Sequence, residues 1–302
     1  MLTIDPKEIS VPKLHAFMLA SIAPRPIAFA STVDIEGIPN LSPFSFFNAF
    51  GSNPPTLIFS PARRVRDNTT KHTLQNIEQV PEVVINTVNF EMVQQASLSS
   101  VEFPKGTNEF LKSGFNPEPS IRVKPFRVKE STVQFECRVV EVKSMGNEGG
   151  AANLIICEIM LMHISELILT EQGRIDQHKI DLVARLGDDY YVRASGAALF
   201  EVPKPNIKPA IGIDLLPESI RLSKVLTGNN LGQLGNSQHI PTKEELNSVA
   251  IGAAITELSE RFHNDDESFN YHTHILAKEF LDEGNVMAAW KVLLLEDDAN
   301  AK

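Results

Sequence analysis

A run of cations and hydroxyl groups, ARRVRDNTTKHT, occupies residues 62–73 and could bind an anion. It holds three arginines, one lysine and three threonines in a chain whose formal net charge is −10. A phosphate dianion binds cations, hydroxyl groups and backbone N–H groups, and a helix N-terminus presents such N–H groups. The overlapping HTLQNIEQ, residues 72–79, predicts a short helix that Thr69 or Thr70 would cap. The run therefore predicts a phosphate site, with a solvated turn as the alternative.

A second chemical pattern precedes the basic run. In NLSPFSFFN, residues 40–48, small polar side chains alternate with phenylalanines. One ligand with a phosphate is flavin mononucleotide (FMN). Its flavin is a flat ring with one polar and one apolar edge, so it needs polar groups beside aromatic walls. Four side chains could bind the polar atoms of the ring and its ribityl chain: Asn40, Ser42, Ser45 and Asn48. The two segments together fit FMN, although phenylalanines more often belong to a protein core.

The composition is that of an ordinary globular protein. Of the 302 residues, 42% are hydrophobic and 22% charged, enough apolar material for one large domain or two smaller ones. The net charge of −10 argues against nucleic acid or an anionic membrane as the main partner. No apolar run approaches the roughly 20 residues of a spanning helix, and the polar MLTIDPKEIS suggests no signal peptide. Cys137 and Cys157 predict two buried free thiols, so we expect a cytoplasmic protein.

The sequence pattern of residues 1–202 predicts a mainly β domain. Alternating apolar residues in 131–145 and 154–167, on either side of GNEGG, predict a long antiparallel hairpin. Further strands are predicted at 27–30, from 39 onward, at 56–60 and at 82–88, with a second hairpin at 181–194 and helices at 10–20 and 90–98. Period-2 patterning with hairpin connections predicts an antiparallel sheet, and a closed barrel is one way to remove its exposed edges.

The composition changes near residue 200. EVPKPNIKPAIG, residues 201–212, holds three prolines and predicts a linker or an extended arm. Helices are predicted beyond it at 242–262, capped by Thr242, and at 270–298, broken at Gly284–Asn285. We therefore expect residues 203–302 to form a proline-rich linker and a helical C-terminal extension.

Several motifs follow one another along the chain: Arg25-Pro26, Thr32, Asp34 with Gly37, Asn40, Pro43-Phe44-Ser45 and Pro54-Pro55. In this order they resemble the N-terminal signature of the flavin reductase-like, FMN-binding split-barrel family. The basic run resembles that family's phosphate loop, and VVINTV resembles its next strand, which ends in an asparagine, here Asn86. FPKGTNEFLKSGF (103–115) and RLGDDYY (185–191) resemble two later segments. The resemblance covers residues 10–200, except that Asp188 replaces a glycine, and residues 203–302 have no counterpart in it.

The resemblance implies a fold, a cofactor and a partner. It implies an antiparallel split β-barrel with peripheral helices, forming a homodimer with FMN near the interface. It also implies that NADH or NADPH passes hydride to N5 of FMN, so that flavin or a flavin-linked small-molecule acceptor is reduced. No catalytic side chain is assigned, because the flavin itself carries the chemistry. The expected FMN contacts are Asn40, Leu41, Ser42, Ser45, Phe46, Asn48, Ser60, Arg63, Arg64, Asn68, Thr69, Lys71, Thr73 and Asn86.

Two other functions share these motifs. The chain could carry FMN for electron transfer without turning over a nicotinamide. The β domain could instead be a structural module, with the helices of 210–298 binding a partner. No metal site is expected, because His272 and His274 would point about 200° apart on a helix. On a strand or loop the two could share a metal with Asp265 or Asp266, which is the alternative to surface histidines.

Overall fold

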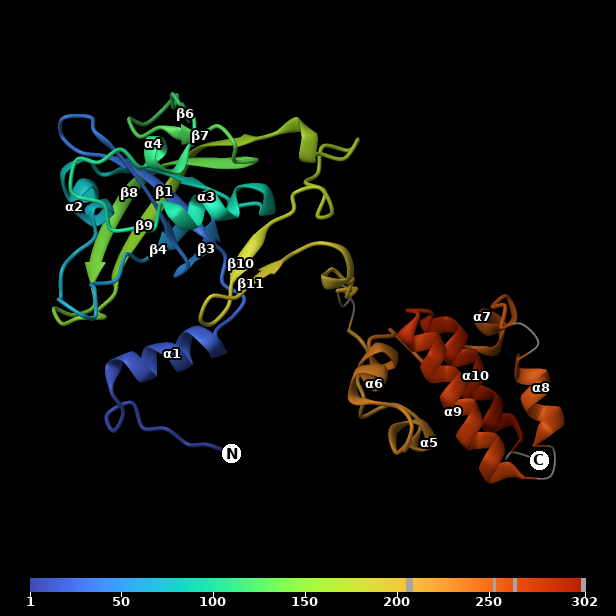
Figure 1. Ribbon diagram of the computed structural model, residues 1–302. Coiled ribbons are helices and arrows are strands. Elements are labelled where there is room, and N and C mark those ends of the chain that lie inside the picture. Colours follow the sequence, from blue (N-terminus) through green and yellow to red (C-terminus); the bar gives the residue numbers. More distant parts are fainter. Residues whose placement is uncertain (205–208, 252–253, 263–264, 300–302) are drawn as a thin grey trace. The chain divides into compact units, whose positions relative to one another are not determined.

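The computed structural model describes residues 1–204, 209–251, 254–262 and 265–299. The chain divides into two compact units, Met1–Phe200 and Glu201–Lys302 (Figure 1). We propose that these units are two domains, since their division falls beside the proline-rich segment.

Seven strands form the main sheet of the first unit. They are β1 (Ala28–Val33), β2 (Pro39–Phe44), β3 (Phe47–Ser52), β4 (Pro55–Phe59), β5 (Glu82–Asn86), β8 (Val133–Ser144) and β9 (Asn153–Ile164). Their order in the sheet is β2-β1-β5-β8-β9-β4-β3, and every neighbouring pair is antiparallel. The long hairpin predicted from alternating residues is β8 and β9, whose turn contains GNEGG.

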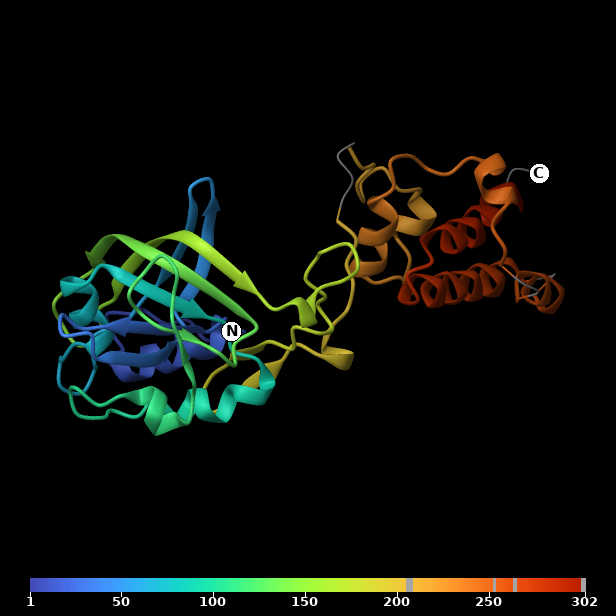
Figure 2. The ribbon, with the colours of Figure 1, turned by 90° about the horizontal axis from the view of Figure 1, so that it is seen from above.

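The two edge strands of this sheet, β2 and β3, are consecutive in the chain. Only Ser45 and Phe46 separate the end of β2 from the start of β3. Such a short connection requires the sheet to curl until its two edges approach each other, while the β3–β4 hairpin projects outward (Figure 2). Among the described residues no strand pairing joins the edges. The structure is therefore a curled antiparallel sheet, and the closed barrel considered from the sequence is not formed.

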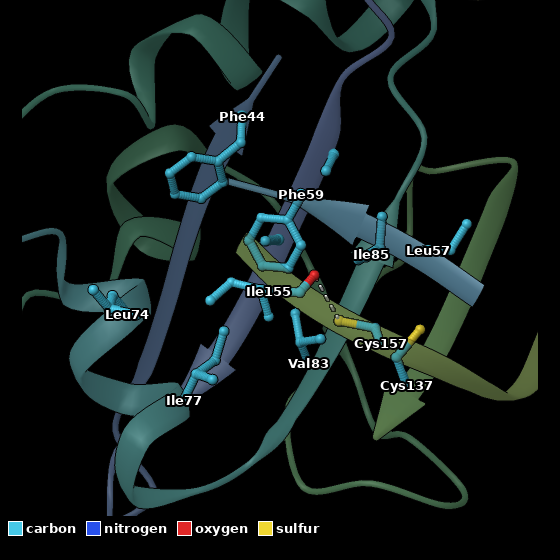
Figure 3. Close-up of a cluster of buried hydrophobic side chains, with 12 residues drawn as sticks. Phe44, Leu57, Phe59, Leu74, Ile77, Val83, Ile85, Cys137, Ile155 and Cys157 are labelled. Carbon is cyan, nitrogen blue, oxygen red and sulfur yellow. Dashed lines mark hydrogen bonds between the residues drawn. The ribbon is translucent and has the colours of Figure 1, made fainter. Parts of the chain in front are cut away.

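The main apolar core lies against the curled sheet and helix α2 (His72–Gln79) (Figure 3). Phe44 of β2 and Phe59 of β4 meet in it, with ring centroids 5.5 Å apart. Helix α2 buries four residues on one side, Thr73, Leu74, Asn76 and Ile77, and of these Leu74 and Ile77 belong to the core. Both cysteines are buried free thiols, as the sequence predicts, and burial raises the pKa of Cys157 to about 12. Neither thiol is therefore a candidate for chemistry at neutral pH.

A second apolar cluster packs the helical residues 90–98 and 109–113 onto β1 and β2. The other elements are α1 (Val11–Ser21), η1 (Phe90–Met92), α3 (Val93–Leu98), α4 (Glu109–Ser113), β6 (Pro117–Glu118), β7 (Arg127–Val128), η2 (Glu166–Ile168), β10 (Val183–Arg185), β11 (Tyr191–Arg193) and η3 (Gly196–Ala198). Helix α4 begins at Asn108, whose side chain caps it, and ends at Gly114, which has a φ of 71°. These two caps place Glu109, the first helical residue, against β2.

A buried carboxylate ties the loop between β6 and β7 to the sheet. Glu136 of β8 is fully buried and accepts hydrogen bonds from the N–H groups of Ile121, at 2.9 Å, and Arg122, at 2.5 Å. Its Oε1 lies 2.7 Å from Nε2 of His163 and 3.9 Å from Nε of Arg127. Burial raises the pKa of Glu136, but these hydrogen bonds outweigh burial and leave its pKa below the ordinary value. The carboxylate is therefore charged where it holds the loop.

The second unit is helical. Its helices are α5 (Glu218–Arg221), α6 (Gly228–Gly235), α7 (Lys243–Asn247), α8 (Ala254–Arg261), α9 (Asp266–Asp282) and α10 (Val286–Ala299). Trp290 is fully buried at the centre of its apolar core, and its Nε1 donates to Oγ of Ser237 at 2.9 Å. The predicted break at Gly284–Asn285 is confirmed, because α9 and α10 meet there. In the described part of the chain, no three His, Cys, Asp or Glu side chains gather to hold a metal ion, and no helix is long and apolar enough to cross a membrane.

The single helix predicted for residues 242–262 is wrong. Thr242 does cap a helix, through a capping box with Glu245, but α7 ends at Asn247. Nζ of Lys291 on α10 donates to the carbonyl oxygen of Val249 at 2.7 Å. Residues 248–251, which follow α7, are not helical, and this long-range contact to Val249 is not visible in the apolar periodicity.

Candidate functional site

A groove with a volume of about 490 Å³ opens where the two edges of the curled sheet approach each other. It is lined by the end of β2, by the connection Ser45–Phe46 and by Ser60 after β4. The basic loop that precedes α2 lines it as well. The lining residues are His15, Pro43, Phe44, Ser45, Phe46, Ser60, Ala62, Arg63, Arg64, Val65, Arg66, Lys71, Glu102 and Gly150. The groove thus unites the two segments that the sequence singles out.

Arg25, from the Arg-Pro motif, fixes one border of the groove. Its guanidinium donates to the carbonyl oxygens of Leu19 and Ile22 at the C-terminal end of α1, and to that of Leu186. Such a cation satisfies helix carbonyls that have no partner within the helix. Nε of Arg25 also approaches Oγ of Ser45, at 3.4 Å. Arg25 therefore positions both helix α1 and the hydroxyl group at the sheet edge.

Arg63 hydrogen-bonds within the basic loop. Its Nε donates to Oδ1 of Asn68 and its Nη2 to the carbonyl oxygen of Asn68, both at 2.6 Å. Asn68 has a φ of 57°, a left-handed conformation that asparagine tolerates, and its Nδ2 donates to the carbonyl oxygen of Asn147. A Cβ atom on Gly149 would lie 2.9 Å from the carbonyl oxygen of Val65, so only glycine allows this approach. The glycine-rich turn of the β8–β9 hairpin therefore supports the basic loop.

Arg64 and Lys71 bring positive charge to the groove. Nη1 of Arg64 donates to Oγ1 of Thr69 at 2.8 Å and to the carbonyl oxygen of Thr70 at 2.7 Å. Burial, and then the neighbouring Arg64, lowers the pKa of Lys71. An anion close to both groups would relieve their repulsion. In the structure that anion is Glu102, whose Oε1 lies 2.7 Å from Nε of Arg64 and 3.8 Å from Nζ of Lys71.

The N-terminus of helix α2 lies beside these cations. Its N-cap is Lys71, whose side chain makes no capping hydrogen bond. The prediction that Thr69 or Thr70 caps this helix is wrong, because both hydroxyl groups are used elsewhere. Oγ1 of Thr69 donates to Asp67 at 2.6 Å, and Oγ1 of Thr70 accepts from Gln75 at 2.9 Å. With no side-chain cap in the described structure, the first N–H groups of α2 add their partial positive charge to this corner.

A smaller cavity, of about 30 Å³, shares Arg64 and Lys71 with the groove. Asn40 lines it, accepting a hydrogen bond from Oγ1 of Thr73 at 2.8 Å and donating one to Oε1 of Glu109 at 3.0 Å. Burial raises the pKa of Glu109 against the opposing effect of its hydrogen bonds. The chain Glu109–Asn40–Thr73 joins α4, β2 and α2, and it fixes the start of α2 relative to the strand.

Most of the predicted contact residues gather at these two cavities. Those that line one or both are Asn40, Ser42, Ser45, Phe46, Ser60, Arg63, Arg64, Lys71 and Thr73. The other five line neither. Asn68 and Thr69 hydrogen-bond within the loop, and Asn48 is exposed on β3. Leu41 and Asn86 are fully buried, and the side chain of Asn86 hydrogen-bonds two backbone groups.

The structure adds three residues that the sequence analysis did not select. His15 of α1 lines the groove with its ring edge-on to Phe46, at a centroid distance of 6.1 Å. Glu109 holds Asn40, and it is the glutamate of the FPKGTNEF segment, so that motif could have identified it. Glu102 pairs with the basic loop, and no pattern in the sequence links it to that loop.

Comparison with known proteins identifies the family to which the chain is similar. The sequence profile of the flavin reductase like domain matches residues 20–176. An uncharacterized protein from Aquifex aeolicus is 36% identical over 196 residues, which cover 65% of this chain and 97% of that protein. Nitrilotriacetate monooxygenase component B from Bacillus cereus superposes with a TM-score of 0.62 at 27% identity, over 67% of this chain and 98% of that one. A flavin reductase-type protein with a split barrel domain from Shewanella frigidimarina superposes with a TM-score of 0.56 at 26% identity, over 68% and 100%.

The matched residues include β1 to β9 and all of the basic loop. The profile covers more than half of the chain, and the Aquifex relative is matched over almost its whole length. This chain therefore belongs to the flavin reductase like domain family.

Proposed function

We propose that this protein is an FMN-binding oxidoreductase that uses NADH or NADPH to reduce flavin or a flavin-linked acceptor. The proposal rests mainly on one observation: a member of the flavin reductase like domain family carries paired cations and a serine-phenylalanine wall on one groove. The relatives' names agree with it, since one is a monooxygenase component and another a flavin reductase-type protein.

The residues at the groove fit FMN. The volume of the groove, about 490 Å³, lies within the range of small-molecule sites. Ser60 is 6% exposed, and its Oγ has no hydrogen-bond partner among the described residues. A buried hydroxyl group without a partner costs free energy, so a polar ligand atom at this wall would stabilise the site. The cations Arg64 and Lys71 line the same groove, where they could bind a phosphate.

The cations and the serine-phenylalanine wall would contact different parts of FMN. Arg64 and Lys71, with the N-terminus of α2, would hold the phosphate by charge-assisted hydrogen bonds. Ser45, positioned by Arg25, and Ser60 would orient the polar edge of the ring, while Phe46 covers its apolar part. Bound FMN would supply the redox chemistry, by accepting hydride from the nicotinamide. The protein contributes binding and orientation.

The test is anaerobic reduction of the FMN-loaded protein. The flavin absorbance in the visible range should bleach within seconds when a stoichiometric amount of NADH or NADPH is added, because the nicotinamide reduces bound FMN. Flavin that stays oxidised with both nicotinamides, yet is reduced by dithionite, would contradict the proposal. That outcome would favour the alternative, an FMN carrier that receives electrons from another protein.

We further propose that the protein is a homodimer. Met160, Met162 and Ile164 lie near the C-terminal end of β9, and each is at least 36% exposed. Neighbouring apolar side chains left exposed on one sheet face commonly mark an interface. Sedimentation equilibrium should give twice the chain mass of 33.4 kDa, and Met162→Glu should shift the mass toward a single chain. A wild-type protein that sediments as one chain at micromolar concentration would show that this face has no such role.

A cytoplasmic location is part of the proposal. It is supported by two free, buried cysteines, as proteins of a reducing compartment commonly have. Detection of the protein in a secreted fraction would contradict it.

A further inference from the structure

One carboxylate lies among the cations that would bind the flavin phosphate. Oε1 of Glu102 lies 2.7 Å from Nε of Arg64 and 3.8 Å from Nζ of Lys71, and its Oε2 contacts Nη2 of Arg66. Both the groove and the smaller cavity include Glu102 among their lining residues. A carboxylate and a phosphate present similar oxygen atoms to guanidinium and ammonium groups. Glu102 therefore occupies the position that a phosphate would need.

The cations around Glu102 do not need Glu102 to hold them in place, and they could pair with another anion. Arg64 is held by Thr69 and Thr70 through separate hydrogen bonds, so its place does not depend on the carboxylate. The side chain of Glu102 is 35% exposed, so it can turn into solvent without leaving a buried charge. The cations belong to the loop before α2, whereas Glu102 follows α3 in a segment that lines the smaller cavity.

We propose that Glu102 determines which flavins this site holds and how tightly, by competing with the flavin phosphate for Arg64 and Lys71. This inference rests on the proposed FMN-binding function and deepens it. Glu102 keeps the cations paired while the site is without phosphate, and it must move away when a phosphate enters. The competition weakens phosphate binding and leaves the ring contacts unchanged. FMN is then an exchangeable ligand rather than a permanently bound group.

The size of the effect follows from the strength of such contacts. Exposed ion pairs each change an equilibrium by only about two- to fivefold. Glu102 makes more than one such ion pair, and its charge also repels an incoming phosphate dianion at close range. Removing the charge of Glu102 should therefore strengthen FMN binding by about tenfold. Riboflavin has the same ring and ribityl chain but no phosphate, so its affinity should not change.

The experiment is a titration of the full chain with FMN and with riboflavin, followed by quenching of flavin fluorescence at fixed ionic strength. Glu102→Gln should bind FMN about tenfold more tightly than wild type and riboflavin equally well. Glu102→Asp keeps the charge and should stay closer to wild type. Glu118→Gln is the matched control, because Glu118 has a similar side-chain exposure of 39% and pairs with Arg127 outside the lining of the groove.

Each outcome decides the inference. An FMN affinity of Glu102→Gln equal to or below that of wild type overturns it, as does a gain in riboflavin affinity as large as the gain in FMN affinity. If Glu102→Gln misfolds by circular dichroism, Glu102→Ala carries the same prediction. Wild-type protein that binds neither flavin would reject the proposed function itself, which distinguishes that failure from the failure of this inference.

Discussion

FMN should bind the double variant Arg64→Ala/Lys71→Ala about 100- to 20,000-fold more weakly than it binds the wild type. Each charged hydrogen bond to a phosphate contributes about 1.5–3 kcal/mol, and about 1.4 kcal/mol corresponds to a factor of ten. The two side chains are only 15% and 30% exposed, so solvent screens their charge less than at an open surface. Arg64 also holds the threonine hydroxyl and carbonyl groups before α2, and its loss would loosen that loop.

The measurement is isothermal titration of each protein with FMN and with riboflavin. Arg122→Ala/Lys129→Ala removes the same charge from exposed positions outside the groove and should keep wild-type affinity. Riboflavin should bind the Arg64→Ala/Lys71→Ala variant almost as it binds wild type, since it lacks the phosphate. Undiminished FMN affinity in that variant would mean that the phosphate lies elsewhere.

The second large effect is on stability, at the carboxylate that holds the β6–β7 loop. Glu136→Leu should lower the free energy of unfolding by about 3–5 kcal/mol, the usual cost of removing one partner of a buried charged network. The change leaves the N–H groups of Ile121 and Arg122 without their acceptor, and it leaves His163 without its partner. Urea denaturation of flavin-free protein measures this difference.

Glu158→Gln is the control for this experiment. Glu158 pairs with Arg138 at 2.6 Å on a more exposed part of the sheet, so its loss should cost less than about 1 kcal/mol. If Glu136→Leu and Glu158→Gln unfold at the same urea concentration, the buried network does not stabilise the fold as we describe.

Acid should weaken the same network. The pKa of Glu136 in the folded protein is below its ordinary value, so its contribution to stability is fully present above the unfolded-state pKa of about 4.3. That contribution is lost as the pH falls below this value and through the folded-state pKa, because the unfolded chain then binds more protons. Between about pH 5 and pH 3 the wild type should therefore lose stability more steeply than Glu136→Gln, whose amide does not titrate. Parallel profiles would contradict the lowered pKa.

The sequence predicts the hairpins of this fold well and the arrangement of the sheet poorly. Residues 131–167 alternate over many positions, so β8 and β9 are visible locally. The order of strands is not, because it depends on pairings between segments far apart, such as β4 with β9. The helix predicted over 242–262 ends early, at Asn247, and beyond that point Lys291, which is distant in the sequence, contacts Val249.

At the site, residue type predicts the chemistry but not the role of each side chain. The cluster of cations is visible in the sequence, and Arg64 and Lys71 do face the groove. Arg63 looks equivalent in the sequence, yet its guanidinium folds the loop through Asn68. Glu102 is the reverse case, because only the folded chain brings it to the cations. The local pattern shows which charges exist, and tertiary contacts decide where they point.

The basic loop before α2 is proposed to bind the phosphate of FMN, and every role described for the groove follows from that contact. A crystal structure of the protein grown with excess FMN tests it most directly. We expect the phosphate to contact Arg64 and Lys71, with the ring against the Ser45–Phe46 connection and Glu102 turned away from the cations. FMN bound with its phosphate in another place, or a groove without flavin at saturating concentration, would contradict the account.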